Sequence, residues 1–319
     1  GPFSERTRRL FQRVPPIQRL YRASIWARFE SKWLWMRKGS FSSDIARKAF
    51  SKELAKMASD DLPEEALVPD YPLGCRRILI SNDWYPALLR PNVHVVTDGI
   101  DRITPEGVVA GGELHRADTI VFGTGFQATG FLAPIRITGR HGVDLHEQWA
   151  DGAEAHLGIT VAGFPNLFVL YGPNTNLGHN SIIFMLERQI SYTLTCIRAL
   201  VEEGIAALTV RPEAQAASNE RLESDLERTV WAAECHSWYK TATGRITNNW
   251  SGPTLTYWLR TALPRRHDFA AIDRPAGAAT GAAGADAAGG RGGGGRWPVH
   301  RVDGEQRGRL PRLTGPTGV

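Results

Sequence analysis

The sequence is short of cysteine, and this shortage excludes two kinds of site. Three cysteines, Cys75, Cys196 and Cys235, occur among the 319 residues, and none belongs to a CxxC pair or a His/Cys cluster. This spacing indicates neither a zinc site nor a redox dithiol, so we assign no metal ligands. A sparse, odd cysteine count is typical of proteins in a reducing compartment. We therefore expect a cytoplasmic protein.

Long apolar runs and a basic folded part are also lacking. No stretch reaches the roughly 18 apolar residues that a membrane-spanning helix needs, and the N-terminal residues are polar and arginine-rich, unlike a secretory signal. The formal net charge is +5, but nine arginines and five acidic residues beyond Leu263 supply four of these charges. A nucleic-acid-binding fold needs a basic face. The sequence thus predicts no membrane and no nucleic-acid partner.

The stretch that carries most information is Asp118–Phe126, which reads DTIVFGTGF. Thr119–Phe122 is a short apolar, β-branched run that stops at Gly123, Thr124 and Gly125, a pattern that predicts a buried strand ending in a tight turn. In open α/β sheets, ligands bind just beyond the carboxyl ends of the strands. A core strand followed by an ordinary turn fits the same residues, so this stretch alone leaves both interpretations open.

Four further stretches accompany this one in a fixed order: Arg76–Val96, Gly163–Gly172, Pro173–Gln189 and Cys235–Trp250. Asp118–Phe126 itself is similar to a (D)xxxxATGF segment, with Gly123 in place of the usual alanine, and the resemblance that the five stretches carry covers roughly residues 2–263. In this order they resemble the flavin-dependent monooxygenases. These are the Baeyer–Villiger and flavin-containing monooxygenases, including the 4-hydroxyacetophenone monooxygenase type.

The resemblance implies an α/β fold, the C-terminal part of a flavoprotein with two dinucleotide-binding domains. Residues 1–115 would be the remnant of an NADP-binding domain with a helical insertion, and residues 116–263 the C-terminal part of an FAD-binding domain. Residues 264–319 are rich in Gly, Ala, Arg and Pro. Such a segment buries too little apolar surface to become ordered, so we expect a disordered tail. The run Gly289–Arg296 also permits an RNA-binding interpretation, but we favour an extension without a role.

Hydrophobic periodicity and turn residues predict the elements. Helices are expected within residues 1–40, from Ser43, over Trp84–Leu89, from Ser181 to about Glu203, from Pro212 towards Val230, and over Pro253–Leu263. Strands are expected at Arg77–Ser81, Val93–Val96, Thr119–Phe122, Leu167–Tyr171 and Leu208–Val210, with a hairpin at Gly107–Leu114. The helix from Ser181 has one apolar face formed by Ile183, Leu186, Ile190, Leu194 and Ile197.

The loops that hold both cofactors of the family are missing. No GxGxxG opens a βαβ unit before residue 264, and the FxGxxxHxxxW-type signature that separates the two loops is absent as well. The sequence therefore predicts a chain without the N-terminal half of such an enzyme. It would be a fragment, a truncated gene product or one piece of a split enzyme, and we expect it to be inactive alone.

The resemblance also implies a function. In the family, NADPH reduces FAD, the reduced flavin takes up molecular oxygen, and the peroxyflavin inserts one oxygen atom into a small organic substrate, a ketone, sulfide or amine. FAD, NADP, this substrate and the missing half would be the partners of the chain. A non-catalytic pseudoenzyme or interaction module derived from the fold is the alternative. A flavoprotein disulfide reductase is disfavoured, because no CxxxxC or CxxC pair is present.

The resemblance assigns the catalytic role to Arg77, because a guanidinium that stays charged suits stabilisation of an anionic peroxyflavin. The cofactor-binding residues that it implies are Arg76 for NADP, Gly123, Thr124, Gly125 and Phe126 against FAD, Asn180 and Ser181 beside the flavin ring, and Trp238 near the nicotinamide ribose. Judged from the residues alone, two surface arginines and a core tryptophan are the favoured interpretation, and Ser181 would be a helix cap in either case.

We predict that residues 1–319 alone do not retain FAD, because the missing loops normally anchor the pyrophosphate through backbone N–H groups. The measurement is the visible spectrum of the purified chain. A stoichiometric flavin band near 450 nm (roughly, as in other flavoproteins) would contradict the prediction.

Overall fold

The computed structural model describes residues 3–59, 62–234 and 237–273. Its helices are α1 (Glu5–Arg13), α2 (Pro15–Glu30), α3 (Phe41–Ala55), α4 (Glu64–Leu67), α5 (Trp84–Leu88), α6 (Leu145–Gln148), α7 (Ile182–Glu202), α8 (Pro212–Leu226) and α9 (Thr254–Thr261). Its strands are β1 (Ile100–Thr104), β2 (Gly107–Ala110), β3 (Glu113–Arg116), β4 (Ala207–Val210) and β5 (Phe269–Ile272). The helices predicted at Trp84–Leu89, Ser181, Pro212 and Pro253 are therefore confirmed, while α3 begins at Phe41, two residues before Ser43.

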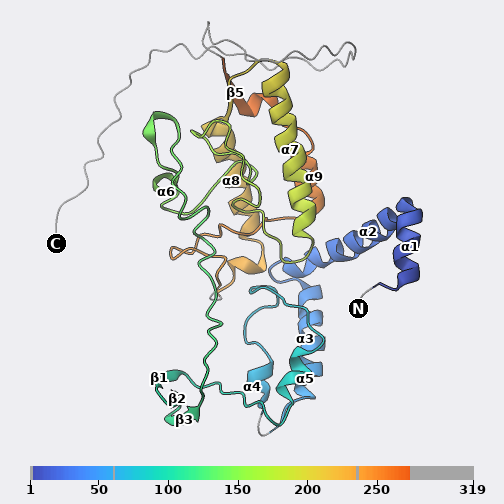
Figure 1. The fold of residues 1–319 in the computed structure, drawn as a ribbon, viewed down its shortest axis with the longest axis vertical. Coiled ribbons are helices and arrows are strands. Elements are labelled where there is room, and N and C mark those ends of the chain that lie inside the picture. Colours follow the sequence, from blue (N-terminus) through green and yellow to red (C-terminus); the bar gives the residue numbers. More distant parts are fainter. Residues whose placement is uncertain (1–2, 60–61, 235–236, 274–319) are drawn as a thin grey trace, which may run out of the picture.

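The main body is built around α7, which packs against α9 and lies beside α8 in the upper part of Figure 1. Met185, Gln189, Tyr192 and Cys196 recur every three or four residues and are buried, so this stripe faces the core. The core clusters beneath it are dominated by aromatic and branched side chains, which include Trp231, Tyr239, Trp250, Tyr257, Ile159, Leu208, Val210 and Phe269.

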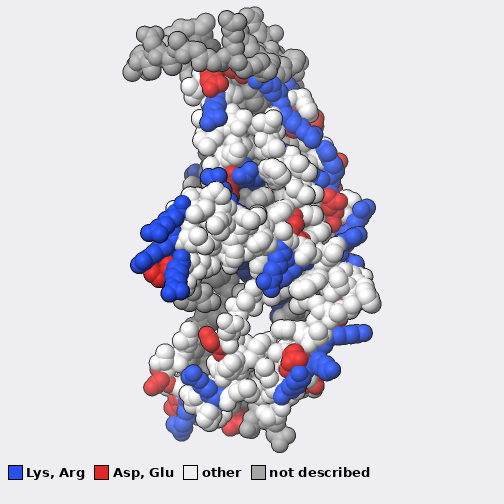
Figure 2. Space-filling model, turned by 90° about the vertical axis from the view of Figure 1, so that its right-hand side faces the viewer, with Lys and Arg blue, Asp and Glu red and all other residues white. Residues whose placement is uncertain are grey.

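A second apolar stripe of α7 is not covered. Ile183, Ile190, Leu194 and Ile197, which the sequence placed together on one face of this helix, are 40–60% exposed. An exposed apolar stripe of this kind is typical of a surface that contacts a partner, a ligand or a further structural element. On the face of the molecule shown in Figure 2, uncharged areas likewise separate the scattered Lys and Arg side chains.

The sheets are small and antiparallel. One has the order β1-β2-β3 and the other pairs β4 with β5. The predicted hairpin at Gly107–Leu114 is confirmed as β2–β3, and its turn residues Gly111 and Gly112 both have positive φ, which glycine adopts without strain. Within the described ranges no parallel sheet forms, so the sheets that are present do not by themselves identify the expected α/β fold.

Four of the expected strands form no ladder, and the reason is the same in each case: no neighbouring strand is present to accept and donate the backbone hydrogen bonds. Leu167–Tyr171 makes one isolated bridge, between Phe168 and Thr160. The others, Arg77–Ser81, Val93–Val96 and Thr119–Phe122, belong to no strand. After β3, residues 117–127 form an extended segment without regular structure, which we call the thread. Figure 1 shows it running towards the upper body. Leu79 is 81% and Val121 89% exposed, values opposite to those of a buried strand.

The folded part extends further than the composition suggested. β5 lies within the segment that we expected to be disordered, and it pairs with β4 from Ala207 to Val210. Phe269 of β5 is 2% exposed and packs in the same core as Tyr192 and Leu208. The boundary at residue 264 was therefore wrong, because four residues with alternating burial suffice to complete a small sheet. The expectation for residues 274–319 lies outside the described residues.

Glu30, the last residue of α2, fastens this helix to the main body. Its carboxylate accepts hydrogen bonds from Asn180 Nδ2 at 2.7 Å, Thr254 Oγ1 at 2.7 Å and the backbone N–H of Leu255 at 2.9 Å. Burial opposes ionisation of this group, but the nearby His179 ring and the three donors together outweigh it and lower the pKa of Glu30 to about 2. One carboxylate thus joins the end of α2 to the beginnings of α7 and α9.

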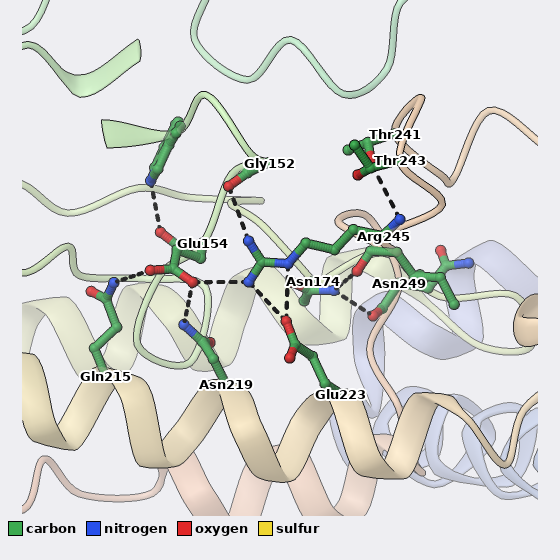
Figure 3. A network of polar contacts seen from close by, with 12 residues as sticks. Gly152, Glu154, Asn174, Gln215, Asn219, Glu223, Thr241, Thr243, Arg245 and Asn249 are labelled. Atoms are coloured by element: carbon green, nitrogen blue, oxygen red, sulfur yellow. Dashed lines mark hydrogen bonds and ion pairs between the residues drawn. The ribbon is translucent and has the colours of Figure 1, made fainter. Parts of the chain in front are cut away.

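A second polar network joins α8 to two loops, the one that carries Glu154 and the one that carries Arg245 (Figure 3). Arg245 donates to Glu154 Oε2 at 2.9 Å and to Glu223 Oε1 at 2.9 Å, while Gln215 and Asn219 of α8 also donate to Glu154. Since these side chains are only partly exposed, each bond is screened less than a surface ion pair. The network holds the loop around residue 245 against α8.

We predict that Glu30→Gln lowers stability at neutral pH by about 2–3 kcal/mol, because an amide cannot satisfy the three donors as a carboxylate does. The pKa of Glu30 is lower in the folded than in the unfolded state, so its contribution is complete above pH 4.5 and is lost as pH falls towards 2. Urea unfolding at pH 7 and at several acidic pH values measures this.

The matched control is Glu53→Gln, whose carboxylate pairs with Lys56 on the surface and should contribute less than about 0.5 kcal/mol. If wild type and Glu30→Gln differ by the same amount at pH 7 and pH 3, the charge of Glu30 is not what stabilises the fold.

Candidate functional site

Arg77 is held by a chain of buried amides. Its Nη1 donates to Asn176 Oδ1 at 3.4 Å, and the Tyr171 hydroxyl donates to the same oxygen at 2.9 Å. Asn176 Nδ2 in turn donates to Asn249 Oδ1 at 2.6 Å. Burial raises the pKa of Tyr171, and the nearby Arg77 charge acts in the opposite direction. The guanidinium is thus oriented by neutral groups, and no carboxylate among the described residues forms an ion pair with it.

A cleft of about 970 Å³ opens beside Arg77. One wall is formed by Trp26 and Phe29 of α2, and Phe184 lines the cleft from α7. Asn180 and Ser181, at the beginning of α7, line it as well. Two predicted cofactor-binding residues and the predicted catalytic arginine therefore lie in one cleft.

The beginning of α7 gives this cleft a positive end. Ser181 caps the helix by accepting the N–H of Phe184 at 3.4 Å, and Asn180 Oδ1 accepts the N–H of Ser181 at 2.8 Å. The amides of the first helical turn carry a partial positive charge that favours anions. Combined with the fixed charge of Arg77, this arrangement can stabilise a negatively charged planar ligand.

His179 also lines the cleft, and sequence reasoning left it without a role because no partner was visible nearby in the chain. Its side chain is fully buried, and neither ring nitrogen has a hydrogen-bond partner. Nε2 lies 3.7 Å from Glu30 Oε2, too far for a good hydrogen bond, and the ring packs 5.3 Å from that of Trp33. The preceding residue, Gly178, packs closely on another ring, since a Cβ there would lie 3.0 Å from Trp231.

Arg76 points to a different place. Its guanidinium lies over the Tyr71 ring at 4.3 Å and lines a neighbouring cleft of about 600 Å³, which also includes Arg77. Of the two consecutive arginines, Arg77 thus lines both clefts, whereas Arg76 lines only the second.

Phe126 and Trp238 line a third cleft, of about 410 Å³, together with Tyr171 and Asn176. The partners of Arg77 thus connect the first and third clefts. Trp238 is half-exposed and stacks on Tyr239, with ring centroids 5.5 Å apart, so the interpretation of Trp238 as a fully buried core residue is wrong.

Gly123, Thr124 and Gly125 are not packed against the other predicted residues. A Cβ placed at Gly123 or Gly125 would have nothing within 4 Å, and Thr124 is exposed. The expected buried strand before them is missing, because the thread that carries them has no neighbouring strand. The structure therefore brings together Arg77, Asn180 and Ser181, connects Phe126 and Trp238 to them through Asn176, and leaves the three-residue turn apart.

The residues present fit a flavin in part. The orphaned nitrogens of His179, the charge of Arg77 and the beginning of α7 provide partners for the polar edge of such a ring, and Trp26 and Phe184 provide apolar walls. Within the described ranges, no group of three or more His, Cys, Asp or Glu residues could hold a metal ion. None of the described helices combines the length and apolar character needed to cross a bilayer.

Comparison with known proteins finds monooxygenases that are similar to this chain. The chain is 38% identical to a Baeyer–Villiger monooxygenase of Pseudomonas aeruginosa over 84% of its own length and 51% of that protein. It is 43% identical to the FAD-binding monooxygenase ktnD of Aspergillus niger over 69% of its length and 38% of that protein. No protein-family profile matches it.

Among solved structures, an oxidized steroid monooxygenase bound to NADP matches 75% of this chain and 47% of its own, with a TM-score of 0.66 and 28% identity. The chain spans about half the length of the curated relatives it matches first. By sequence and by fold, the chain is a relative of the flavin-dependent Baeyer–Villiger monooxygenases.

Proposed function

We propose that this chain supplies part of the active site of an FAD- and NADPH-dependent monooxygenase. The enzyme would insert one atom of molecular oxygen into a small organic substrate, a ketone, sulfide or amine. The observation that carries the proposal is the meeting of Arg77 with Asn180 and Ser181, at the positive beginning of α7, in one cleft. A bound flavin would supply the redox chemistry and the oxygen-carrying atom.

The chain's own residues would hold and orient negative charge in this cleft. Asn176 fixes Arg77 without neutralising it, so the full positive charge faces the cleft. The free amides of the first turn of α7 add to the field from a second direction. Because both charges are in place before a ligand arrives, little reorganisation is needed when anionic character develops. The apolar side chains of Trp26 and Phe29 would limit the access of water.

NADP would contact the side of Arg77 that faces Arg76 and Tyr71, and Trp238 would approach it from the third cleft. Support comes from the position of Arg77 between two clefts and from the connection of the third through Asn176. In this proposal Gly123–Phe126 lies against FAD only when the thread becomes a strand of a sheet.

We propose further that a missing N-terminal half provides that sheet. Two observations support this. The chain spans 51% of its Pseudomonas relative, and apolar residues stay exposed in three places: Ile78–Ile80, the thread and α7. Leu79, Ile80, Val121 and Phe122 could each pair with an added strand, which would satisfy backbone groups and cover apolar surface at once. The missing half would also carry both pyrophosphate-binding loops.

The alternative is a non-catalytic module that retained the fold without the cofactors. The exposed turn at Gly123–Gly125 favours it, since nothing in the described residues packs against that turn. The two candidate functions lead to different expectations: only in a catalytic protein would substitution of Arg77 change the rate of product formation.

We predict that Arg77→Ala, in a protein that joins this chain to the missing pyrophosphate loops, lowers product formation about 10²–10³-fold, because a preorganised charge next to an anion is lost. Reduction of the flavin by NADPH should change less, since it precedes that anion. Arg77→Lys should recover part of the rate, because a point charge lacks the planar fork. NADPH oxidation, hydrogen peroxide release and product are measured in parallel.

The control is Arg198→Ala, an exposed arginine of α7 that does not line the cleft, and it should behave as wild type. A wild-type rate of product formation in Arg77→Ala would make Arg77 structural. Failure of flavin reduction instead would make it an NADP ligand.

A further inference from the structure

A small cleft of about 180 Å³ lies where α8, the end of α9 and the approach to β5 meet, and it shares no lining residue with the cleft of Arg77. Its charged lining residues are Arg221, Arg260, Arg265, His267 and Asp268. Three arginines thus face one carboxylate. Arg260 approaches Asp225 at 4.0 Å, whereas Arg221 and Arg265 make no ion pair within the described part of the chain.

Two buried polar atoms at this cleft lack a hydrogen-bond partner: the hydroxyl of Tyr192 and Nε2 of His156. The other ring nitrogen, Nδ1 of His156, lies 3.3 Å from the carbonyl oxygen of Ala214 and donates to it, which fixes the ring. Nε2 is 3.6 Å from Asp268 Oδ2, beyond hydrogen-bond distance. A buried polar atom without a partner destabilises the fold, so a polar ligand that reached both atoms would be favoured by the hydrogen bonds it completes.

The charges decide which ligand fits. A cation is disfavoured by three arginines, and residues 3–59, 62–234 and 237–273 contain no group of acidic, His and Cys side chains suited to a metal. A dinucleotide is far too large for a cleft of about 180 Å³. A compact dianion matches the excess of positive charge, and guanidinium groups bind oxyanions through paired hydrogen bonds.

We propose that this cleft binds a small tetrahedral oxyanion, such as phosphate, sulfate or the phosphate group of a small monoester. Arg221 and Arg265 hold its charge, the Tyr192 hydroxyl donates to one oxygen, and His156 donates from Nε2 after taking up a proton. The site is independent of the monooxygenase proposal, because none of its residues lies in the Arg77 cleft.

Proton uptake on binding follows from the surroundings of His156. Burial lowers the pKa of this group, Asp268 raises it, and Arg265 and Arg221 lower it again. A bound dianion would offset the two arginines and favour the protonated ring. The titratable and charged groups that face the ring across the cleft are Tyr192, Arg221, Arg260, Arg265, His267 and Asp268.

The test is thermal unfolding of the full chain with increasing sodium sulfate or sodium phosphate, compared with sodium chloride at equal ionic strength. We expect a saturable rise in Tm with both oxyanions, because a ligand that binds the native state stabilises it. The double variant Arg221→Gln, Arg265→Gln should bind sulfate about tenfold more weakly or worse. Arg198→Gln, outside the cleft, should bind as wild type.

Sulfate stays a dianion between pH 6 and 8, so a pH dependence of its binding reports on the protein. Binding should be tighter at pH 6 than at pH 8 in wild type and in His267→Gln, and should lose this dependence in His156→Gln. Tyr192→Phe, which removes one oxygen without changing the ring, should weaken binding. Glycerol phosphate in place of phosphate distinguishes a monoester site, which takes it equally well, from a free-ion site, which rejects it.

Sulfate and phosphate that stabilise no more than chloride would overturn the proposal. So would a saturable effect that is unchanged in both the arginine double variant and Tyr192→Phe, since the ion would then bind elsewhere.

Discussion

An extended backbone needs a neighbouring strand to complete its hydrogen bonds, and this requirement decides which parts of the chain become regular. Helices satisfy their own backbone, so α7, α8 and α9 form from local sequence and pack around Trp231 and Tyr257. The apolar runs at Ile78–Ile80 and Ile120–Phe122 have no such independence. They stay unpaired and exposed, although their composition is that of core strands.

Side-chain hydrogen bonds take over where backbone ladders are missing. Glu30 ties the end of α2 to α7 and α9, and Asn176 ties Arg77 to the loop that carries Asn249. That loop is braced in turn by Arg245 and its two glutamates. The positive half of the candidate site is therefore built by long-range polar contacts, which fix side chains without requiring a sheet beneath them.

This division explains what the sequence could predict. Helical period and capping residues act within a few positions, so α7 with its Ser181 cap was predictable, as was the hairpin with glycines at Gly111 and Gly112. β5 was hidden because its four residues follow a change of composition and pair with β4, about sixty residues earlier in the chain. The surroundings of His179 were hidden for the same reason, since Glu30, whose Oε2 lies 3.7 Å from Nε2 of this ring, is distant in sequence. The family motifs supplied Arg77, which no local pattern would have singled out.

Side-chain hydrogen bonds and backbone strand pairing position different parts of the candidate site. The cleft of Arg77 has its charge, its helix N-terminus and its aromatic walls in place, yet neither ring nitrogen of His179 has a hydrogen-bond partner among the described residues. The turn at Gly123–Gly125, which needs a sheet to hold it, is not in place. In such a site the positive groups are positioned but the turn opposite them is not. An anion would therefore bind only weakly until the strands are paired and hold that turn against the ligand. If the proposed function is correct, completion of the sheet, rather than any further change around Arg77, is the step on which tight cofactor binding would depend.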